Sequence, residues 1–303
     1  MLTFDRYVTA ATLDEAFDAL DASPGARLVA GATDLLPWAR EGRAGDVHLP
    51  ALVDVGAIPA LTAVTAEDGR LRIGAATTIA ACERHPLLLR DAGLLARCAV
   101  WFADDQIREQ ATLGGNLVNA SPAGDMLPAM LAMNAQVVLA RRDGAGTQER
   151  AMPLADFITG PGRTRLGANE ILVRIDCDAV PGHGGAFEKV GHRRSLVIST
   201  VCLAVLARLA PAGGTLADVR IAIGAVGPVP ERLGDAEAAL RGQRPTPASI
   251  REAAELAADR VRSRSRQAYR REVLVNFVER GLVAALAQCG LAVQRLPKET
   301  VHA

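Results

Sequence analysis

The chain has 303 residues; half are hydrophobic but only 3% are aromatic, so its cores must be built from Ala, Val, Leu and Ile. Lys and Arg together number 34, as do Asp and Glu. This balance gives no electrostatic reason to expect a nucleic acid or an anionic membrane as partner. The length allows one large domain or two of ordinary size.

Cysteine usage and the N-terminus bear on the compartment. The five cysteines are scattered, with no C-x-x-C or His/Cys group, which favours reduced, buried thiols over disulfides, a zinc site or an iron–sulfur cluster. The N-terminal stretch carries Asp and Glu where a signal peptide is basic and then apolar, so we expect no export. The longest apolar run, 196–207, is too short to span a bilayer. We therefore expect a cytoplasmic protein with no membrane span and no metal ligands.

The first third of the chain predicts a small parallel sheet. Thr12 begins a capping-box pattern ahead of a helix with an apolar stripe. Short strands are expected at 27–30 and 52–55, and Gly31-Ala32-Thr33-Asp34 lies between them, followed by a helical turn. Strand, helix and strand with short connections would place this glycine-containing loop at the carboxyl ends of the strands.

A second glycine-containing stretch, TLGGNLVNASPAGDMLP, occupies 112–128. Gly114 and Gly115 permit close approach of a ligand to bare main chain. Asp125 stands where a helix N-cap is expected, and Pro128 falls in the first turn of that helix. A Gly-Gly loop, short polar side chains and a helix N-terminus suit a polyanionic ligand such as a dinucleotide. For the glycine pair alone, a plain turn is an equally good explanation.

The remaining elements divide the chain into two halves. Strands are also expected at 71–75, 135–140 and 171–176, helices at 79–84 and 87–100, and a charged hairpin tip at 141–149. PGHGG at 181–185 is the best candidate linker. Beyond it, the pattern predicts strands at 187–190, 196–209 and 219–226, then helices at 235–240, 247–260 and 269–289. Strands followed by helices indicate a separate α+β module. The basic run 262–271 lacks interleaved aromatics and indicates a solvated face or a subunit contact.

Several stretches, taken in order, resemble the FAD subunit of molybdenum hydroxylases, a family that includes xanthine dehydrogenase and aerobic carbon monoxide dehydrogenase. The stretches are VAGATDLLP at 29–37, LRIGAATTIA at 71–80, TLGGNLVNASPAGDMLP at 112–128, LADFITGPGRTRLGANEIL at 154–172, FEKVGHRRSLVIS at 187–199, AIGAVGPVPERL at 222–233 and SRQAYRREVL at 265–274. WFADDQIREQATLGGN at 101–116 is more similar to the xanthine dehydrogenase branch.

This resemblance implies an α+β fold. Its FAD-binding part is of the vanillyl-alcohol oxidase and p-cresol methylhydroxylase type, with two α/β subdomains. Its C-terminal α+β domain has a three-stranded antiparallel sheet and helices. The implied bounds are 1–178 for the FAD-binding domain (subdomains about 1–56 and 57–178), 184–290 for the C-terminal domain and 291–303 for a tail.

The resemblance also implies which residues contact FAD. Ala30 to Asp34 would wrap the diphosphate with backbone N–H groups, and Thr112 to Asn116 would pack against its other side. The full set of expected contacts is Ala30, Gly31, Ala32, Thr33, Asp34, Leu35, Phe102, Ala103, Thr112, Gly114, Gly115, Asn116, Asn119, Ser121, Asp125, Leu166 and Lys189. Ser121 and Asp125 match positions at the ribityl chain, and Leu166 and Lys189 match positions near the isoalloxazine ring. Ala32 stands where the commonest form has a second glycine; we expect its methyl group to be tolerated provided φ is negative.

The implied function is electron transfer. No residue is typical of a nucleophile or a general base for substrate chemistry, so no catalytic residue is expected. A large molybdopterin-binding subunit and a small subunit with two-iron two-sulfur clusters would be the partners, in a dimer of heterotrimers, with NAD⁺, oxygen or a quinone as acceptor. FAD would be the only cofactor of this chain. Two alternatives are a non-redox assembly subunit and a stand-alone flavin oxidase; the latter needs a catalytic Tyr, His or Arg, and Tyr7 and Tyr269 are the only tyrosines.

Overall fold

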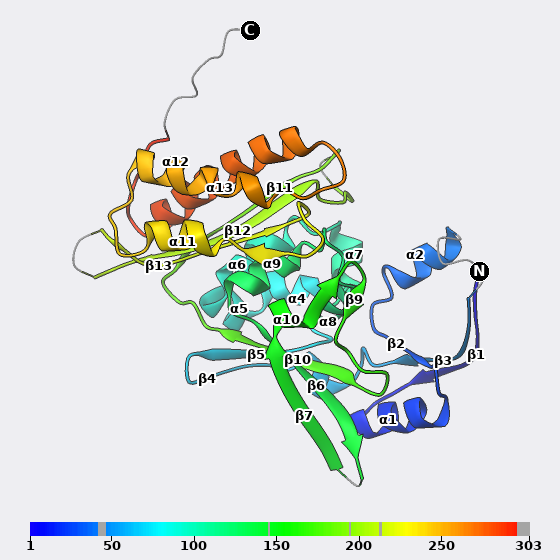
Figure 1. The fold of residues 1–303 in the computed structure, drawn as a ribbon. Helices are drawn as coiled ribbons and strands as arrows, with labels where there is room; N and C mark the ends of the chain where they lie inside the picture. Colours follow the sequence, from blue (N-terminus) through cyan, green and yellow to red (C-terminus); the bar gives the residue numbers. More distant parts are fainter. Residues whose placement is uncertain (42–46, 145, 194, 212–213, 296–303) are drawn as a thin grey trace.

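The computed structural model describes residues 1–41, 47–144, 146–193, 195–211 and 214–295. Within these residues, three parts follow one another along the sequence (Figure 1): a small parallel sheet with two helices, an antiparallel sheet with several short helices, and a C-terminal antiparallel sheet covered by helices. This arrangement agrees with the expected α+β class.

The N-terminal part is a three-stranded parallel sheet with two helices. The strands, in their order across the sheet, are β1 (Leu2–Thr9), β3 (Val47–Asp54) and β2 (Arg27–Val29). The helices are α1 (Leu13–Ala22) and α2 (Leu35–Arg40). Thr12 caps α1 as predicted, because its side chain accepts a hydrogen bond from the Glu15 N–H at 3.1 Å. The parallel unit is confirmed, but β1 was not predicted, since its largely exposed side chains show no apolar alternation.

The middle part is built on a five-stranded antiparallel sheet. Its strands, in order across the sheet, are β4 (Val64–Glu67), β5 (Arg70–Gly74), β10 (Ile171–Asp178), β6 (Gln136–Asp143) and β7 (Gly146–Pro153). A separate two-stranded sheet contains β8 (Ile158–Gly160) and β9 (Arg163–Thr164). The helices are α3 (Pro59–Thr62), α4 (Ile79–Arg84), α5 (Pro86–Asp91), α6 (Gly93–Ala99), α7 (Asp105–Gln110), α8 (Leu113–Asn119), α9 (Met126–Ala132) and α10 (Leu154–Phe157). The single helix expected at 87–100 is divided, because Ala92 leaves helical geometry with φ −144° and ψ 39°.

The C-terminal part is a four-stranded antiparallel sheet. Its strands are β11 (Gly184–Val190), β12 (Val201–Leu209), β13 (Leu216–Gly224) and β14 (Glu231–Arg232). Its helices are α11 (Gly234–Leu240), α12 (Pro247–Glu255), a 3-10 turn (Ala258–Arg260) and α13 (Gln267–Gln288). The three expected strands are present, and the two-residue β14 is added at one edge. The strand expected from 196 begins only at 201, because Leu196 has φ +50°, which is left-handed backbone.

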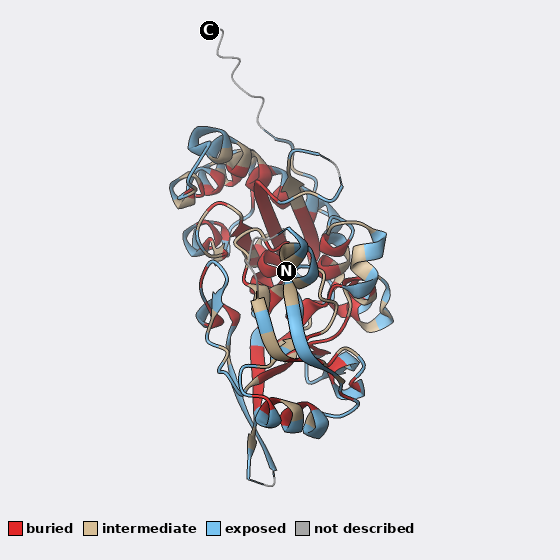
Figure 2. Ribbon diagram, turned by 90° about the vertical axis from the view of Figure 1, so that its right-hand side faces the viewer, coloured by how far each residue is buried: buried red, intermediate tan, exposed pale blue. Residues whose placement is uncertain are grey.

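Strand β12 is buried on both faces. Cys202, Ala204 and Leu206 belong to the apolar core of the middle part, whereas Leu203 and Val205 belong to the core beneath α13. Side chains alternate across a strand, so one strand serves two cores. The sheet consequently lies between α6 and α9 of the middle part and its own helices (Figure 1). Figure 2 shows the buried strands of the interior in red.

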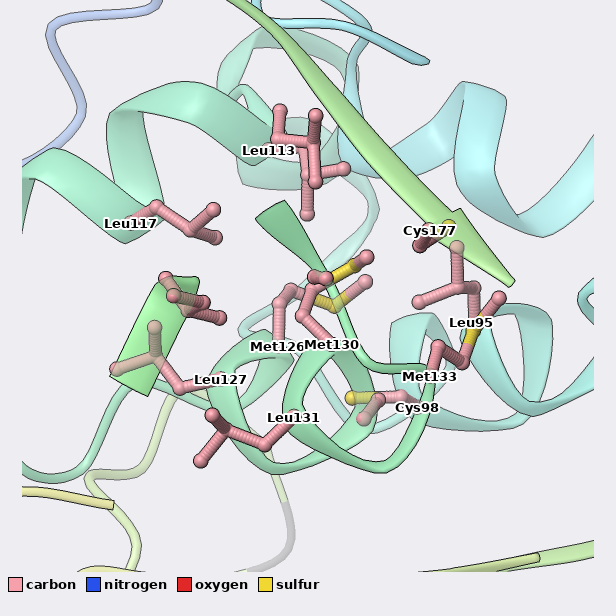
Figure 3. Packing of buried hydrophobic residues seen from close by; sticks show 14 of the residues in the cluster. Leu95, Cys98, Leu113, Leu117, Met126, Leu127, Met130, Leu131, Met133 and Cys177 are labelled. Atoms are coloured by element: carbon pink, nitrogen blue, oxygen red, sulfur yellow. The ribbon is translucent and has the colours of Figure 1, made fainter. Parts of the chain in front are cut away.

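Helix α9 is the centre of the middle core. Every residue from Met126 to Ala132 is buried, and Figure 3 shows its methionine and leucine side chains beside those of Leu95, Cys98 and Leu117. Methionine is flexible enough to fill an irregular space between a helix and two sheets. The predicted apolar helix after Asp125 is therefore confirmed.

Three further features concern cofactors and membranes. All five cysteines are free thiols, and four of them are buried. The described residues contain no cluster of His, Cys, Asp and Glu that could hold a metal ion. In the same part of the chain, no helix combines the length and apolarity needed to cross a membrane.

Gly184 tests the packing of α13 against β11. A Cβ atom at this position would overlap the carbonyl oxygen of Ala285, a backbone atom that cannot move aside. We expect Gly184→Ala to lower the free energy of unfolding by about 1–3 kcal/mol, as overpacking does. Urea unfolding of the purified chain measures this. Gly93→Ala is the matched control, because nothing lies within 4 Å of its Cβ position; equal stabilities of the two variants would contradict the packing.

Candidate functional site

The two glycine-containing segments lie side by side. A Cβ on Gly31 would overlap the carbonyl oxygen of Gln110, the last residue of α7, two residues before the second segment. The Asn119 side-chain amide also donates a hydrogen bond to a carboxylate oxygen of Asp34 at 2.9 Å. The absence of a side chain at Gly31 therefore allows the end of β2 and the end of α7 to meet.

A cavity of about 280 Å³ opens between these segments. Its lining comes from the end of β2, the first glycine loop, α2 and α8. A second cavity of about 110 Å³ shares Ala30, Thr112 and Gly115 with it. The walls of the second cavity are mostly apolar and include Leu61 and Leu172. A cavity with both polar and apolar walls beside a more apolar one suits a ligand with a charged part and a ring system.

The first loop presents free hydrogen-bond donors. No described residue accepts a hydrogen bond from the backbone N–H groups of Gly31, Ala32, Thr33 or Asp34. All four residues line the larger cavity. Successive unpaired N–H groups that face a concavity form a ready site for phosphate oxygens. This supports the expected role of the loop.

The second segment differs from the prediction of an open diglycine loop. Gly114 and Gly115 lie in the first turn of α8, which Thr112 caps: the Thr112 hydroxyl oxygen accepts from the Gly115 N–H at 3.0 Å. The Gly114 N–H donates to the carbonyl of Ala75 at 2.8 Å. These donors are already used within the chain. The glycines instead allow close packing, since a Cβ on Gly114 would lie 2.6 Å from the Ala75 carbonyl oxygen.

Ala32 adopts left-handed backbone, with φ +52°. The condition under which its methyl group was expected to be tolerated, a negative φ, is therefore not met. Left-handed geometry costs a residue with a Cβ about 1–2 kcal/mol. The loop keeps this geometry although glycine, the residue that fits it without strain, is absent.

The capping role predicted for Asp125 is also wrong. Its side chain makes no cap hydrogen bond at the start of α9. One carboxylate oxygen instead accepts a hydrogen bond from Lys189 at 2.6 Å and the other from Ser199 at 2.6 Å. Asp125 is 7% exposed; burial raises the pKa of its carboxyl group, and Lys189 and Ser199 oppose this rise. The helix predicted after Asp125 is present, but the Asp125 carboxylate accepts hydrogen bonds from Lys189 and Ser199 and does not cap that helix.

Most of the predicted contacts line the two cavities. They are Ala30, Gly31, Ala32, Thr33, Asp34, Leu35, Phe102, Thr112, Gly114, Gly115, Asn116, Asn119 and Leu166. Ala103, Ser121, Asp125 and Lys189 are not among the lining residues of these two cavities. Ser121 uses its hydroxyl oxygen to accept from the Ala123 N–H at 3.3 Å.

Sequence reasoning missed part of the lining. The additional residues of the larger cavity are Arg27, Leu28, Val29, Trp38, Ala111, Val118 and Gly162. Val118 follows Gly115 by three residues, so helical periodicity on α8 could have found it. Gly162, between β8 and β9, lies in the 154–172 stretch that resembles the family, but that resemblance assigned a contact only to Leu166.

The donor and acceptor set fits FAD. The free N–H groups of 31–34 can bind phosphate oxygens. The side-chain oxygen of Asn116 is buried, has no hydrogen-bond partner among the described residues, and belongs to a residue that lines the cavity. A buried acceptor of this kind costs about 1–3 kcal/mol unless it is satisfied, and FAD carries hydroxyl and amine donors that can satisfy it.

Gly31 and Ala32 are neighbours, but we expect different effects when Gly31 is replaced by Ala and when Ala32 is replaced by Gly. Gly31→Ala sets a methyl group against the Gln110 carbonyl and should weaken FAD binding at least about tenfold, or 1.4 kcal/mol. Ala32→Gly removes left-handed strain but adds flexibility to the unfolded chain, so stability should stay equal or rise by up to about 1 kcal/mol. FAD titration and urea unfolding measure both. Wild-type FAD affinity in Gly31→Ala would contradict the close contact.

Comparison with known proteins agrees with this geometry. Residues 2–177 match the family described as the FAD binding domain in molybdopterin dehydrogenase. Residues 186–285 match the CO dehydrogenase flavoprotein C-terminal domain. The first match covers the N-terminal and middle parts of the structure, and the second lies within the C-terminal part.

Individual relatives and a solved structure are also similar. The xanthine dehydrogenase FAD-binding subunit of Escherichia coli O157:H7 is 34% identical over 240 residues, covering 78% of this chain and 79% of that protein. The carbon monoxide dehydrogenase medium chain of Hydrogenophaga pseudoflava is 30% identical over 271 residues, covering 87% and 90%. A structure of carbon monoxide dehydrogenase from Hydrogenophaga pseudoflava superposes with a TM-score of 0.85 at 30% identity, covering 94% of this chain and 98% of that chain.

These findings confirm the resemblance, the fold class and FAD as the cofactor of this chain. They also confirm an oxidoreductase flavoprotein subunit. The chain belongs to the FAD-binding subunit family of the molybdopterin-dependent dehydrogenases.

Proposed function

We propose that the chain receives electrons from iron–sulfur clusters of a small partner subunit and passes them to a soluble acceptor. NAD⁺, oxygen and a quinone are the candidate acceptors. Bound FAD would supply the redox chemistry, while the protein positions it. The observation that carries the proposal is the cavity between the two glycine-containing segments, whose lining includes both α8 and residues 31–34, the residues with free backbone N–H groups.

The lining residues support electron transfer over substrate chemistry. Among the described lining of the two cavities there is no Tyr, His or Cys. Its arginine, Arg27, is an exposed residue at the start of β2. A stand-alone flavin oxidase needs a general base or a similar group over the ring. The acidic residue of the lining, Asp34, lies in the loop assigned to the diphosphate, and its carboxylate accepts a hydrogen bond from Asn119. The cavity is therefore better suited to holding a cofactor than to acting on an organic substrate.

The relatives support partner subunits. Two of them are named a carbon monoxide dehydrogenase medium chain and a nicotine 6-hydroxylase medium subunit. Because these names refer to different substrates, we infer that substrate choice lies in a large molybdopterin-binding subunit. We propose a dimer of heterotrimers, with the xanthine dehydrogenase branch favoured by the 101–116 segment. We also propose domain bounds of 1–178 and 184–290, with subdomains at 1–56 and 57–178.

Gly115→Val tests cofactor binding. A Cβ at Gly115 would lie 2.8 Å from the Thr112 hydroxyl oxygen that caps α8, and a branched side chain would also enter the cavity. We expect the purified variant to lack flavin absorbance that the parent chain shows after reconstitution with FAD. Gly234→Val is the control, because nothing lies within 4 Å of its Cβ position. Flavin absorbance retained in Gly115→Val would exclude this cavity as the FAD site.

Reduction of the flavin distinguishes the three candidate functions. We expect the isolated, FAD-loaded chain to remain oxidised with an organic substrate alone, and to be reduced once the co-purified partner subunits are added. Stopped-flow absorbance of the flavin measures this, and supplying NAD⁺, oxygen or a quinone in turn identifies the acceptor. Reduction of the isolated chain by substrate would indicate a stand-alone oxidase. No reduction in the complete complex would indicate an assembly subunit.

A further inference from the structure

Helix α7 contacts two parts of the lining of the larger cavity. At its last residue, the carbonyl oxygen of Gln110 meets Gly31 of the first glycine loop. Two residues earlier, Arg108 donates a hydrogen bond to the carbonyl of Phe102 at 2.9 Å. Gly31 and Phe102 both line the larger cavity. One short helix therefore connects two lining residues that are far apart in the sequence.

The segment that carries Phe102 is exposed and irregular. Val100 is 57% exposed and Trp101 is 43% exposed, and Ala103 has left-handed backbone with φ +41°. Such geometry persists in an alanine only where surrounding contacts fix it. The carbonyl groups of Trp101 and Ala103 accept hydrogen bonds from the C-terminal part. Those of Val100 and Phe102 accept from Arg108.

The guanidinium group of Arg108 is nearly enclosed. Its side chain is 11% exposed. The Nη1 atom donates to the carbonyl of Phe102 and, at 3.3 Å, to that of Val100, while Nη2 donates to the carboxylate of Asp105. A planar guanidinium group can serve two carbonyls and a carboxylate at once, whereas the compact ammonium group of a lysine cannot reproduce this fork.

Glu83 of α4 supplies a second carboxylate. Its Oε2 atom lies 3.5 Å from Nε of Arg108, and both atoms are buried without a hydrogen-bond partner among the described residues. Opposite charges still attract each other at this distance. Nε therefore lies toward α4, and the two Nη atoms remain available to the Val100–Phe102 segment and to Asp105.

We propose that Arg108 is a positioning residue of the FAD site: it holds the main chain of Val100–Phe102 so that Phe102 lines the larger cavity, and Glu83 is its counterion. Because α7 also meets Gly31, the position of Phe102 is coupled to that of the first glycine loop. Arg108 lines neither cavity, so its effect on FAD affinity is transmitted by the segment. The inference rests on the proposed role of this cavity as the FAD site.

Replacing Arg108 tests this role. In Arg108→Met both carbonyls lose their donor, so the Kd for FAD should rise about tenfold. In Arg108→Lys one carbonyl can keep a donor, so a rise of about fivefold is expected. The full-length apo chain is titrated with FAD at a temperature where circular dichroism shows each variant to be folded. Under this condition, a loss of stability alone leaves the Kd unchanged.

Arg84→Met is the matched control. Arg84 of α4 pairs with Glu109 of α7 at 2.8 Å, and their side chains are 62% and 54% exposed. This variant breaks an ion pair between the same two helices without removing a donor from the segment, so its Kd should match the parent. A folded Arg108 variant, with Met or with Lys, whose Kd stays within about twofold of the parent overturns the proposal.

A second measurement needs no cofactor, and therefore tests Arg108 even if the parent chain fails to bind FAD, a result that would contradict the proposed function. The chain has two tryptophans, Trp38 and Trp101, so a Trp38→Phe background leaves Trp101 as the fluorescent probe of the segment. We expect its anisotropy decay to gain a fast component in Arg108→Met but not in Arg84→Met. An unchanged decay in folded Arg108→Met would show that Arg108 does not hold the segment.

Discussion

The contact between Gly31 and the carbonyl of Gln110 is the constraint on which the site depends. Main chain meets main chain here, with no room for a side chain. Because the ends of β2 and α7 meet in this way, the first glycine loop and α8 become opposite walls of one cavity. The Asn119–Asp34 hydrogen bond adds a second connection between the same walls. Two segments that lie far apart in the sequence thus form one site, although they do not belong to the same sheet.

The two glycine-containing segments have different physical roles. In the first, the N–H groups of 31–34 have no acceptor among the described residues and remain available to an anion. In the second, the Thr112 hydroxyl and the Ala75 carbonyl already accept from the Gly115 and Gly114 N–H groups. The glycines there allow close packing, because without side chains α8 can lie directly against the chain that follows β5. The first segment offers hydrogen-bond donors to a ligand. The second forms the opposite wall of the cavity and offers an unsatisfied acceptor at Asn116.

The sequence allowed most of the lining of the larger cavity to be predicted, because glycine patterns, short polar residues and the family resemblance are local signals. It failed where tertiary contacts decide. Asp125 had the residue type and position of a helix cap, but a lysine far along the chain takes its carboxylate. Ala32 adopts left-handed backbone against the preference of a residue with a Cβ. Strand β1 lacks alternation since few of its side chains are buried. Gly162 reaches the cavity from the hairpin of β8 and β9, where the resemblance assigned a contact only to the nearby Leu166.

The C-terminal part was expected to be a separate module, since its strands precede its helices. Strand β12 shows why that picture is incomplete: Cys202, Ala204 and Leu206 are buried in the core of the FAD-binding part, and separation would expose them to water. The apolar contact brings β11 close enough for Lys189 to reach Asp125 and the Trp101 carbonyl. A charge pair buried this deeply would be costly on its own, so the hydrophobic contact must form with it. Packing thus brings the two parts together, and the ion pair can form only where that packing exists.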